Sequence, residues 1–317
     1  MKSITIQGNE KLLFFTASGI GDTISNLGII NSIKNKYPRL KIDIVVTQNG
    51  IKKLVDFNKA IAKTIKLNFE SFSFWGYTKY FLYGCFGDII LLNKQKYDIL
   101  ICPNIGLLRK FLIRALLCPN KIILGKGPHD VLKEYSILRI LNIRHLSKEP
   151  ILSNINNKNL KISQKIKSTI NPNKKNVIIN MFCADSPSSI RDWSKWDKLV
   201  NLLSQKYNLI LVGEVNFDYK KHYRLNYSKV SNLINKTTLE DIIYLIKESD
   251  LVISVDSSIF HFAYAIGARV IGLFGPVNPK MRIPPVADKK KIWAMYLKKS
   301  CSPCLLNKHI NFFQLYQ

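Results

Sequence analysis

The chain has 317 residues, of which 47% are hydrophobic, so it is long enough for two globular domains and too apolar to be mainly disordered. Its 48 Lys and Arg residues against 21 Asp and Glu residues give a formal net charge of +27 at pH 7. Because this excess is spread over both halves of the chain, it favours attraction to an anionic membrane surface or a phosphorylated acceptor over specific nucleic-acid binding.

The six cysteines are scattered apart from Cys301 and Cys304, and this spacing does not suggest a disulfide framework. The N-terminus lacks the apolar segment of a cleavable signal peptide, and charged residues interrupt the apolar runs 81–92 and 107–118. We therefore expect a cytoplasmic protein that can also lie peripherally at the inner face of the membrane.

The first predicted unit is a strand over 11–16, a glycine-containing turn, a helix that Pro38 ends, and a second strand over 42–46. Two parallel strands joined by a crossover helix form a βαβ unit. Gly21 lets the turn fold tightly, and Asp22 falls at the start of the helix, where a carboxylate is most often an N-cap.

An aromatic-rich segment follows at residues 68–86. We interpret it as the packed core of an amphipathic helical hairpin, and the alternative is a wall that faces an acceptor or a membrane. The basic amphipathic segment 107–118 would extend that wall. Buried strands are predicted at 97–102 and 121–124.

Residues 154–175 are rich in Asn, Lys and Ser and predict a helix followed by an interdomain linker. A strand over 176–182 and a polar turn come next, and then Arg191 before a Trp-containing helix. Arg191 is either a surface residue beside a helix N-terminus or a guanidinium that clamps a diphosphate. A strand over 209–213 and a helix over 239–247 complete this part.

The most informative stretch is 250–279, which predicts strand 251–255, helix 259–266 and strand 270–274 in a second βαβ unit. Open parallel sheets bind ligands outside the carboxyl ends of their strands. That edge brings Asp256 and two serines to a helix N-terminus, with His261 one turn further on, which is a suitable site for an anion. Each of these residues also has an ordinary structural role, as an N-cap or a core histidine.

This stretch resembles the C-terminal signature of glycosyltransferase family 9, the heptosyltransferase-like enzymes. The family pattern is D-T-G-x-x-H-x-A-A-A, then a strand, then F-G-P-T-x-P. The matching residues are Asp256, His261, Ala263, Ala265, Phe274, Gly275, Pro276 and Pro279. Ser257 and Ser258 replace the usual Thr-Gly, and Ser258 adds a Cβ where glycine would permit close approach of a phosphate.

A second resemblance lies near the N-terminus, where the family has S-x-G-D and, after a helix, L-K-x-x-Y-P-x-A-x-I-D. Residues 18–22 and 33–43 are similar to these two patterns. The resemblance gives Asp22 the role of general base, and a carboxylate kept ionised by a helix N-terminus can accept a hydroxyl proton. It also places Arg191 near the donor phosphates, so the predicted binding residues are Gly21, Arg191, Asp256, Ser257, Ser258 and His261.

The resemblance implies an α/β protein of two Rossmann-like domains that face each other across a cleft, the GT-B architecture. Residues 1–170 would be the acceptor-side domain and residues 171–317 the nucleotide-sugar donor-binding domain. The implied reaction is inverting, metal-independent transfer of a sugar, in the family typically heptose from ADP-heptose, to a lipopolysaccharide or related glycan or glycolipid acceptor. No cofactor besides the donor substrate is expected.

Other interpretations stay open at this point. They are an inactive nucleotide-sugar-binding protein, a basic nucleic-acid-associated protein, and an NAD or nucleotide-sugar-modifying enzyme, the last disfavoured because no three-glycine fingerprint follows a strand. The sequence does not decide whether Glu214 or Asp218 contacts the nucleotide. Cys301, Cys304 and His309 form only a weak candidate for a zinc site.

Overall fold

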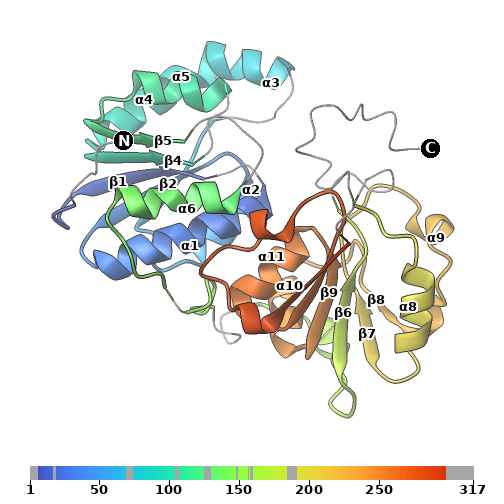
Figure 1. The fold of residues 1–317 in the computed structure, drawn as a ribbon. Helices are drawn as coiled ribbons and strands as arrows, with labels where there is room; N and C mark the ends of the chain where they lie inside the picture. The colour runs from blue at the N-terminus through green and yellow to red at the C-terminus, as the bar shows by residue number, and fades with distance from the viewer. Residues whose placement is uncertain are drawn as a thin grey trace. The chain divides into compact units, whose positions relative to one another are not determined.

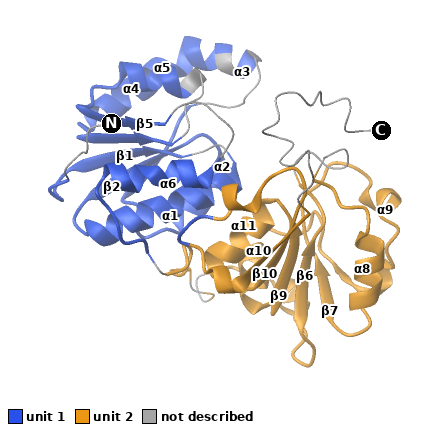
Figure 2. Cartoon of the chain, viewed as in Figure 1, with its two compact units in different colours: residues 1–147, 284–286 blue, residues 148–283, 287–317 orange. Residues whose placement is uncertain are grey.

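The computed structural model describes residues 6–16, 19–68, 74–103, 107–124, 130–147, 149–155, 157, 160–183 and 191–297. The chain forms two compact units, Met1–Ser147 with Pro284–Val286, and Lys148–Ile283 with Ala287–Gln317 (Figure 2). The division falls earlier than the boundary at 170/171 that the sequence predicts. Among the described residues of 154–175, which suggested a helix and linker, the structure has the short helix α7 (Gln164–Lys167), and this helix belongs to unit 2.

Unit 1 contains a five-stranded parallel sheet in the order β3-β2-β1-β4-β5. The strands are β1 (Lys11–Phe15), β2 (Lys41–Val46), β3 (Lys63–Lys66), β4 (Ile99–Cys102) and β5 (Asn120–Ile123). Because β1 pairs with β2 on one side and β4 on the other, the strand order reverses between β1 and β4. The carboxyl ends of these two strands therefore form the ligand-binding switch point that is typical of open α/β sheets.

Helices cover both faces of this sheet (Figure 1). One face carries α1 (Ile20–Lys36), α2 (Asn49–Asp56) and α6 (Val131–Ile140), and the other carries α3 (Phe74–Lys79), the π-helix η1 (Tyr80–Gly84), α4 (Cys85–Lys94) and α5 (Leu107–Ala115). Between α1 and α6, the buried amide of Asn26 donates to the buried carboxylate of Glu134 at 2.8 Å. This bond fixes α1 against its neighbour.

Unit 2 contains a six-stranded parallel sheet in the order β11-β10-β9-β6-β7-β8. The strands are β6 (Asn176–Asn180), β7 (Asn208–Leu211), β8 (Ser231–Asn232), β9 (Leu251–Val255), β10 (Val270–Phe274) and β11 (Ile292–Tyr296). The β9 and β10 bounds are those predicted from the apolar runs. The order reverses between β6 and β9, so this unit has its switch point at their carboxyl ends.

Besides α7, the helices of unit 2 are α8 (Trp196–Leu203), α9 (Tyr219–His222), α10 (Leu239–Glu248) and α11 (Ser258–Ile266), with the 3₁₀ turns η3 (Tyr227–Lys229), η4 (Pro279–Met281) and η5 (Lys289–Lys291). N-cap side chains accept capping hydrogen bonds at α9 and α10, whereas those of α8 and α11 do not. Thr238 and Asp241 form a capping box at the start of α10. Gly267, at φ +84°, ends α11 in the left-handed conformation that favours glycine.

The aromatic segment is not the packed core hairpin that the sequence suggested. Residues 74–94 form one helical segment made of α3, η1 and α4, and the side chain of Tyr80 is buried. Trp75, Tyr83 and Phe86 are exposed, so the core-packing interpretation is wrong for these three. Phe69 and Phe72 lie outside the described residues. In the part of the chain that the structure describes, no helix combines the length and the hydropathy needed to span a membrane.

Candidate active site

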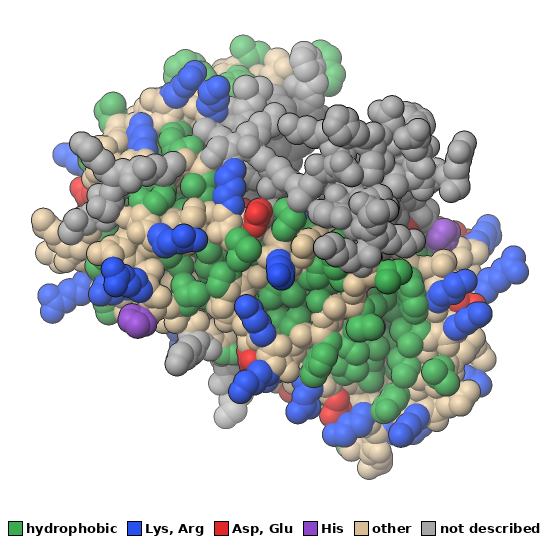
Figure 3. Space-filling view, in the orientation of Figure 1, with side chains coloured by type: hydrophobic (Ala, Val, Ile, Leu, Met, Phe, Trp, Pro, Cys, Tyr) green, Lys and Arg blue, Asp and Glu red, His purple; other side chains and the backbone are tan. Residues whose placement is uncertain are grey.

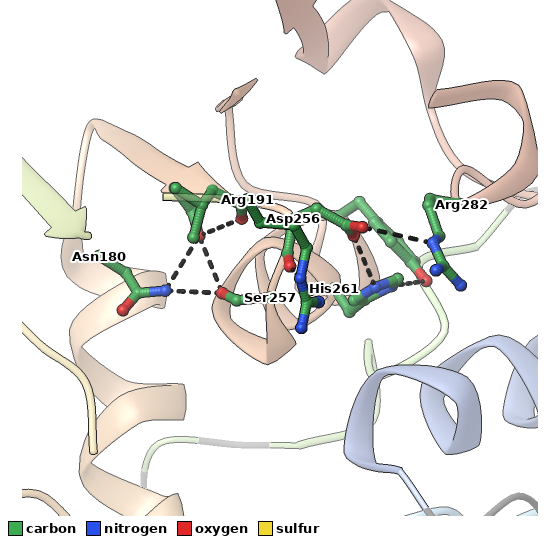
Figure 4. A network of polar contacts seen from close by, with 9 residues as sticks. Asn180, Arg191, Asp256, Ser257, His261 and Arg282 are labelled. Atoms are coloured by element: carbon green, nitrogen blue, oxygen red, sulfur yellow. Dashed lines mark hydrogen bonds and ion pairs between the residues drawn. The ribbon is translucent and has the colours of Figure 1, made fainter. Parts of the chain in front are cut away.

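The main group of predicted site residues lies at the switch point of unit 2 (Figure 4). Asn180 ends β6, and Asp256 and Ser257 follow the neighbouring strand β9. Helix α11 begins at once with the half-buried Ser258. The short polar break after an apolar strand thus places a helix N-terminus at the position where this class of sheet binds ligands.

A hydrogen-bonded group of three polar side chains joins β6 to the start of α11. The Asn180 amide donates to the Ser257 hydroxyl at 2.6 Å and to the Ser254 hydroxyl at 3.2 Å, and the two hydroxyl oxygens are 3.1 Å apart. Ser257 is the N-cap residue of α11, but its side chain makes no capping hydrogen bond. The hydroxyl that would ordinarily satisfy an N–H of the first helical turn is therefore engaged with the sheet.

Asp256 is 3% exposed and lies between two basic side chains. Its Oδ2 is 3.3 Å from Nε of Arg282, and the two groups form an ion pair whose geometry is not that of a hydrogen bond. Its Oδ1 is 3.8 Å from Nε2 of His261. The other ring nitrogen of His261, Nδ1, is 2.9 Å from the hydroxyl of Tyr264. The imidazole of His261 is nearly buried, and these contacts hold its orientation inside the unit.

The proline-rich turn after β10 places Arg282 near the start of α11. Asn278 accepts a hydrogen bond from the backbone N–H of Lys280, and Pro279 occupies the first position of η4. The backbone N–H of Arg282 then donates to the carbonyl of Pro279 at 2.9 Å. This turn returns the chain toward the start of α11, so that the guanidinium of Arg282 reaches Asp256.

Arg191 lies on the same side of the sheet, beside the start of α11. Its guanidinium donates to the backbone carbonyl of Asp256 at 2.9 Å. A positive side chain is thus placed next to the positive end of a helix dipole, an arrangement that suits an anion.

Gly213 allows the strand next to β6 to come close to the polar group. It follows β7 with φ +145°, and a Cβ there would lie 2.9 Å from Oδ1 of Asn180. The two acidic candidates nearby are both exposed. Asp218 caps α9 by accepting from the backbone N–H of Lys221 at 3.4 Å, whereas Glu214 lies in the loop before it.

Unit 1 places Asp22 at its own switch point, in the first turn of α1. A Cβ on Gly19 would lie 3.3 Å from Oδ2 of Asp22, so glycine makes room for the carboxylate. The buried hydroxyl of Thr16 donates to that of Thr23 at 3.1 Å, and Thr23 in turn donates to the carbonyl of Gly19 at 2.8 Å. The start of α1 is therefore fixed to the end of β1.

Arg109 of α5 reaches the same edge, where its guanidinium donates to the carbonyl of Thr16 at 2.6 Å. Sequence reasoning missed this residue, as it missed Asn180 and Ser254. Gly21 lies with Asp22 in the first turn of α1. Asp22 and Gly21 are thus together in unit 1, and the other predicted residues are together in unit 2, namely Arg191, Asp256, Ser257, Ser258 and His261.

The tail residues Cys301, Cys304 and His309 lie outside the described residues. Within the described ranges, no group of three or more His, Cys, Asp and Glu side chains is placed to hold a metal ion.

Two units, each an open parallel sheet with polar side chains at the carboxyl ends of its strands, have the GT-B architecture, and solved structures agree with this fold. The structure of a family 9 glycosyl transferase from Veillonella parvula DSM 2008 is similar with a TM-score of 0.70 and 14% identity, covering 91% of this chain and 86% of that one. The E. coli ADP-heptose LPS heptosyltransferase II is similar with a TM-score of 0.60 and 16% identity, covering 94% of each chain.

The sequence identifies the family within this class. The model described as Glycosyltransferase family 9 (heptosyltransferase) matches residues 128–311, which is more than half of the chain, and the protein belongs to this family. A curated relative, lipooligosaccharide heptosyltransferase 2 of Haemophilus influenzae, is 38% identical over 61 residues. That match covers 19% of this chain and 17% of the relative, so it spans a small part of each protein.

Proposed function

We propose that this glycosyltransferase moves a sugar, in the first instance heptose, from a nucleotide-sugar donor to a lipopolysaccharide or related glycan acceptor. The reaction is inverting and independent of a metal ion. Unit 2 holds the donor, and unit 1 holds the acceptor with Asp22 as general base. Heptose and an ADP donor are chosen because the similar E. coli structure is an ADP-heptose LPS heptosyltransferase.

The observation that supports this proposal most directly is the start of α11 at the β6/β9 switch point. The Ser257 hydroxyl is engaged with Asn180, and the guanidinium of Arg191 is held beside the helix start by the carbonyl of Asp256. Backbone N–H groups of a first turn together with a guanidinium suit the diphosphate of a nucleotide sugar.

The proposed mechanism needs one base and a stabilised leaving group. The Asp22 carboxylate accepts the proton of an acceptor hydroxyl, and the resulting oxygen attacks the anomeric carbon of the donor sugar. A new glycosidic bond forms as the bond from that carbon to the diphosphate oxygen breaks. Attack from the face opposite the leaving group inverts the configuration. The negative charge that develops on the nucleoside diphosphate is stabilised by Arg191 and the α11 dipole.

Asp256, His261 and Arg282 support the donor site without touching the reacting atoms. The buried Asp256–Arg282 ion pair, the approach of His261 to Asp256 and the His261–Tyr264 contact fix the loop between β9 and α11. A rigid loop keeps the helix N-terminus in position for the diphosphate, which reduces the cost of reorganisation during the reaction.

A panel of nucleotide sugars tests the reaction. Purified protein is incubated with each donor and a lipopolysaccharide-core acceptor, and release of nucleoside diphosphate and the anomeric configuration of the product are measured. We expect turnover with ADP-heptose, and an inverted product, without added metal and in the presence of a chelator. Turnover that requires a metal ion, or retention of configuration, would contradict the mechanism, and binding without any transfer would favour an inactive sugar-nucleotide-binding protein.

Arg191→Ala tests the donor placement separately. We expect a loss of donor affinity of about 1–3 kcal/mol, because a charge-assisted contact to the diphosphate is removed. Isothermal titration calorimetry with the donor or its nucleoside diphosphate measures this change. Arg269→Ala is the matched control, because Arg269 is exposed and precedes β10 at the amino end of the sheet. Equal affinities of the parent and Arg191→Ala would exclude the placement.

A further inference from the structure

Helices α3 to α5 of unit 1, with Leu117 just after α5, present a set of large apolar side chains to solvent, which we call the α3–α5 surface. Their exposed fractions range from 41% at Leu91 to 83% at Tyr83. The members are Trp75, Leu82, Tyr83, Phe86, Ile90, Leu91, Phe111 and Leu117. Exposed apolar side chains that occur singly need no explanation, but eight of them on helices that adjoin one another mark an interaction surface.

The helical segment 74–94 carries apolar side chains on both its exposed side and its buried side. Leu82, Phe86 and Ile90 recur at intervals of four residues on the exposed side. The opposite side buries Tyr80 and Leu92 in the core against the sheet. A surface helix of a globular protein normally turns charged residues outward, so an apolar outer side indicates a second contact outside this unit.

Hydrogen bonds fix the helical segment in this orientation. The carboxylate of Asp88 is 1% exposed and accepts from the Tyr80 hydroxyl at 2.7 Å and from the backbone N–H and side-chain amide of Asn68, each at 2.9 Å. Burial raises the pKa of Asp88, whereas these hydrogen bonds act in the opposite direction. A buried polar anchor therefore fixes which side of the segment faces the sheet and which faces outward.

The outer sides of α4 and α5 form one continuous surface. The rings of Phe81 and Phe111 pack edge to face with centroids 5.1 Å apart. Asn93, near the end of α4, donates to the carbonyl of Ala115 at 3.2 Å and accepts from the backbone N–H of Leu117 at 2.8 Å. Apolar side chains of both helices are thus presented together.

The charges on this surface are positive. Its exposed basic residues are Lys79, Lys94, Lys110 and Arg114. The one acidic residue in 74–94 and 107–124 is the buried Asp88. Figure 3 shows hydrophobic side chains beside Lys and Arg side chains over these helices.

We propose that the α3–α5 surface docks on the anionic surface of a lipid bilayer. Aromatic side chains such as Trp75 and Tyr83 occupy the headgroup level of a bilayer favourably, and the basic residues pair with anionic headgroups. Helices with an apolar side and flanking Lys and Arg lie in the interface plane and do not cross it. A second copy of this chain fits less well, because two faces of the same positive charge would repel each other.

Vesicle flotation tests the docking. The full chain is mixed with vesicles of phosphatidylcholine alone or with added phosphatidylglycerol. We expect the protein to float with the anionic vesicles and to be released as the salt concentration rises, because the charge contribution is screened. A protein that stays with the soluble fraction in both mixtures would overturn the proposal. The occupant of this surface would then be another protein.

Two matched pairs of variants assign the binding to this surface. Tyr83→Ser/Phe86→Ser/Ile90→Ser should lower the vesicle partition coefficient by at least about tenfold, because three apolar anchors leave the interface. Leu202→Ser/Met295→Ser removes exposed apolar side chains of unit 2 (65% and 58% exposed) and should bind as the parent does. Lys110→Glu/Arg114→Glu should weaken binding to the anionic vesicles, whereas Lys289→Glu/Lys290→Glu on η5 makes the same change in net charge and should not.

Fluorescence of Trp75 reports directly on how deeply this side chain enters the bilayer. Brominated lipids should quench part of the tryptophan fluorescence of the parent and not of Trp75→Phe, because the other tryptophans lie in unit 2. Circular dichroism and urea unfolding check that each variant is folded. Equal vesicle binding by the parent and the triple serine variant, or equal loss in both charge variants, would overturn the placement. The test does not depend on the proposed reaction, since transfer to a soluble acceptor should be unchanged in all these variants.

Discussion

Asp22→Asn is expected to lower the rate of sugar transfer by about 10²–10⁴-fold, which is the usual effect of removing a positioned general base. Donor affinity should be nearly unchanged, because Asp22 lies in unit 1 and the proposed diphosphate site in unit 2. Thermal stability should change little, because Gly19 and not Asp22 is the N-cap of α1, and asparagine loses only the interaction of the Asp22 charge with the helix dipole, about 0.3–1 kcal/mol. Steady-state kinetics, calorimetry and thermal unfolding of the same preparation measure the three quantities.

The control for this experiment is the same substitution at a cap in the same unit. Asp130 is the N-cap of α6, and its side chain accepts a hydrogen bond from the backbone N–H of Leu132 at 2.9 Å. Asp130→Asn should keep both stability and turnover. If Asp22→Asn transferred sugar at the parent rate, Asp22 would be a structural residue and the proposed mechanism would be wrong.

Asp256→Ala is expected to destabilise the protein by about 3–5 kcal/mol, the usual cost of removing one partner of a buried ion pair. The guanidinium of Arg282, whose side chain is 16% exposed, would lose its carboxylate and stay largely out of solvent. His261 would lose a neighbour at 3.8 Å as well. Urea unfolding at neutral pH measures the change in the free energy of unfolding.

Two further variants separate this interpretation from a general effect of charge. Asp256→Ala/Arg282→Met should recover much of the loss, because the uncompensated charge is replaced by an apolar side chain of similar length. Asp218→Ala removes an exposed carboxylate paired with Lys221 at 3.5 Å and should cost at most about 1–2 kcal/mol, through a lost cap and a surface pair. A double variant no more stable than Asp256→Ala would show that the ion pair is not the cause.

The α/β fold was predictable because parallel strands buried on both faces are continuous apolar runs. The run 251–255 and the run 270–274 have the bounds of β9 and β10. The short strands β3 and β8 were not predicted, because four and two residues with little apolar character do not make such a run. Their position depends on pairing with β2 and β7.

The candidate site was predictable where its residues are close in sequence. Asp256, Ser257 and His261 follow one strand within six residues, so a motif describes them. Asn180 meets Ser257 across 77 positions, and Arg109 meets Thr16 across 93. Contacts of this kind come from strand pairing and helix packing, which a single sequence does not show.

The aromatic segment was misinterpreted for a related reason. Composition identifies residues 74–94 as apolar, but which side of a helix is buried depends on what packs against it. Tyr80 faces the sheet, whereas Tyr83, three positions later, faces solvent. The sequence therefore predicted a helix here and could not predict its outer face.

The π-helix η1 gives this segment a tolerance of chain length that an uninterrupted α-helix lacks. A π-turn holds one residue more than an α-turn for about the same rotation, so η1 takes up an additional residue while α4 keeps its rotation relative to α3. Loss of a single codon between Tyr80 and Gly84 would therefore let η1 close as an ordinary α-turn, with Phe86 and Ile90 still on the exposed side. Such a deletion would cost the surface one side chain and leave its common face in one piece.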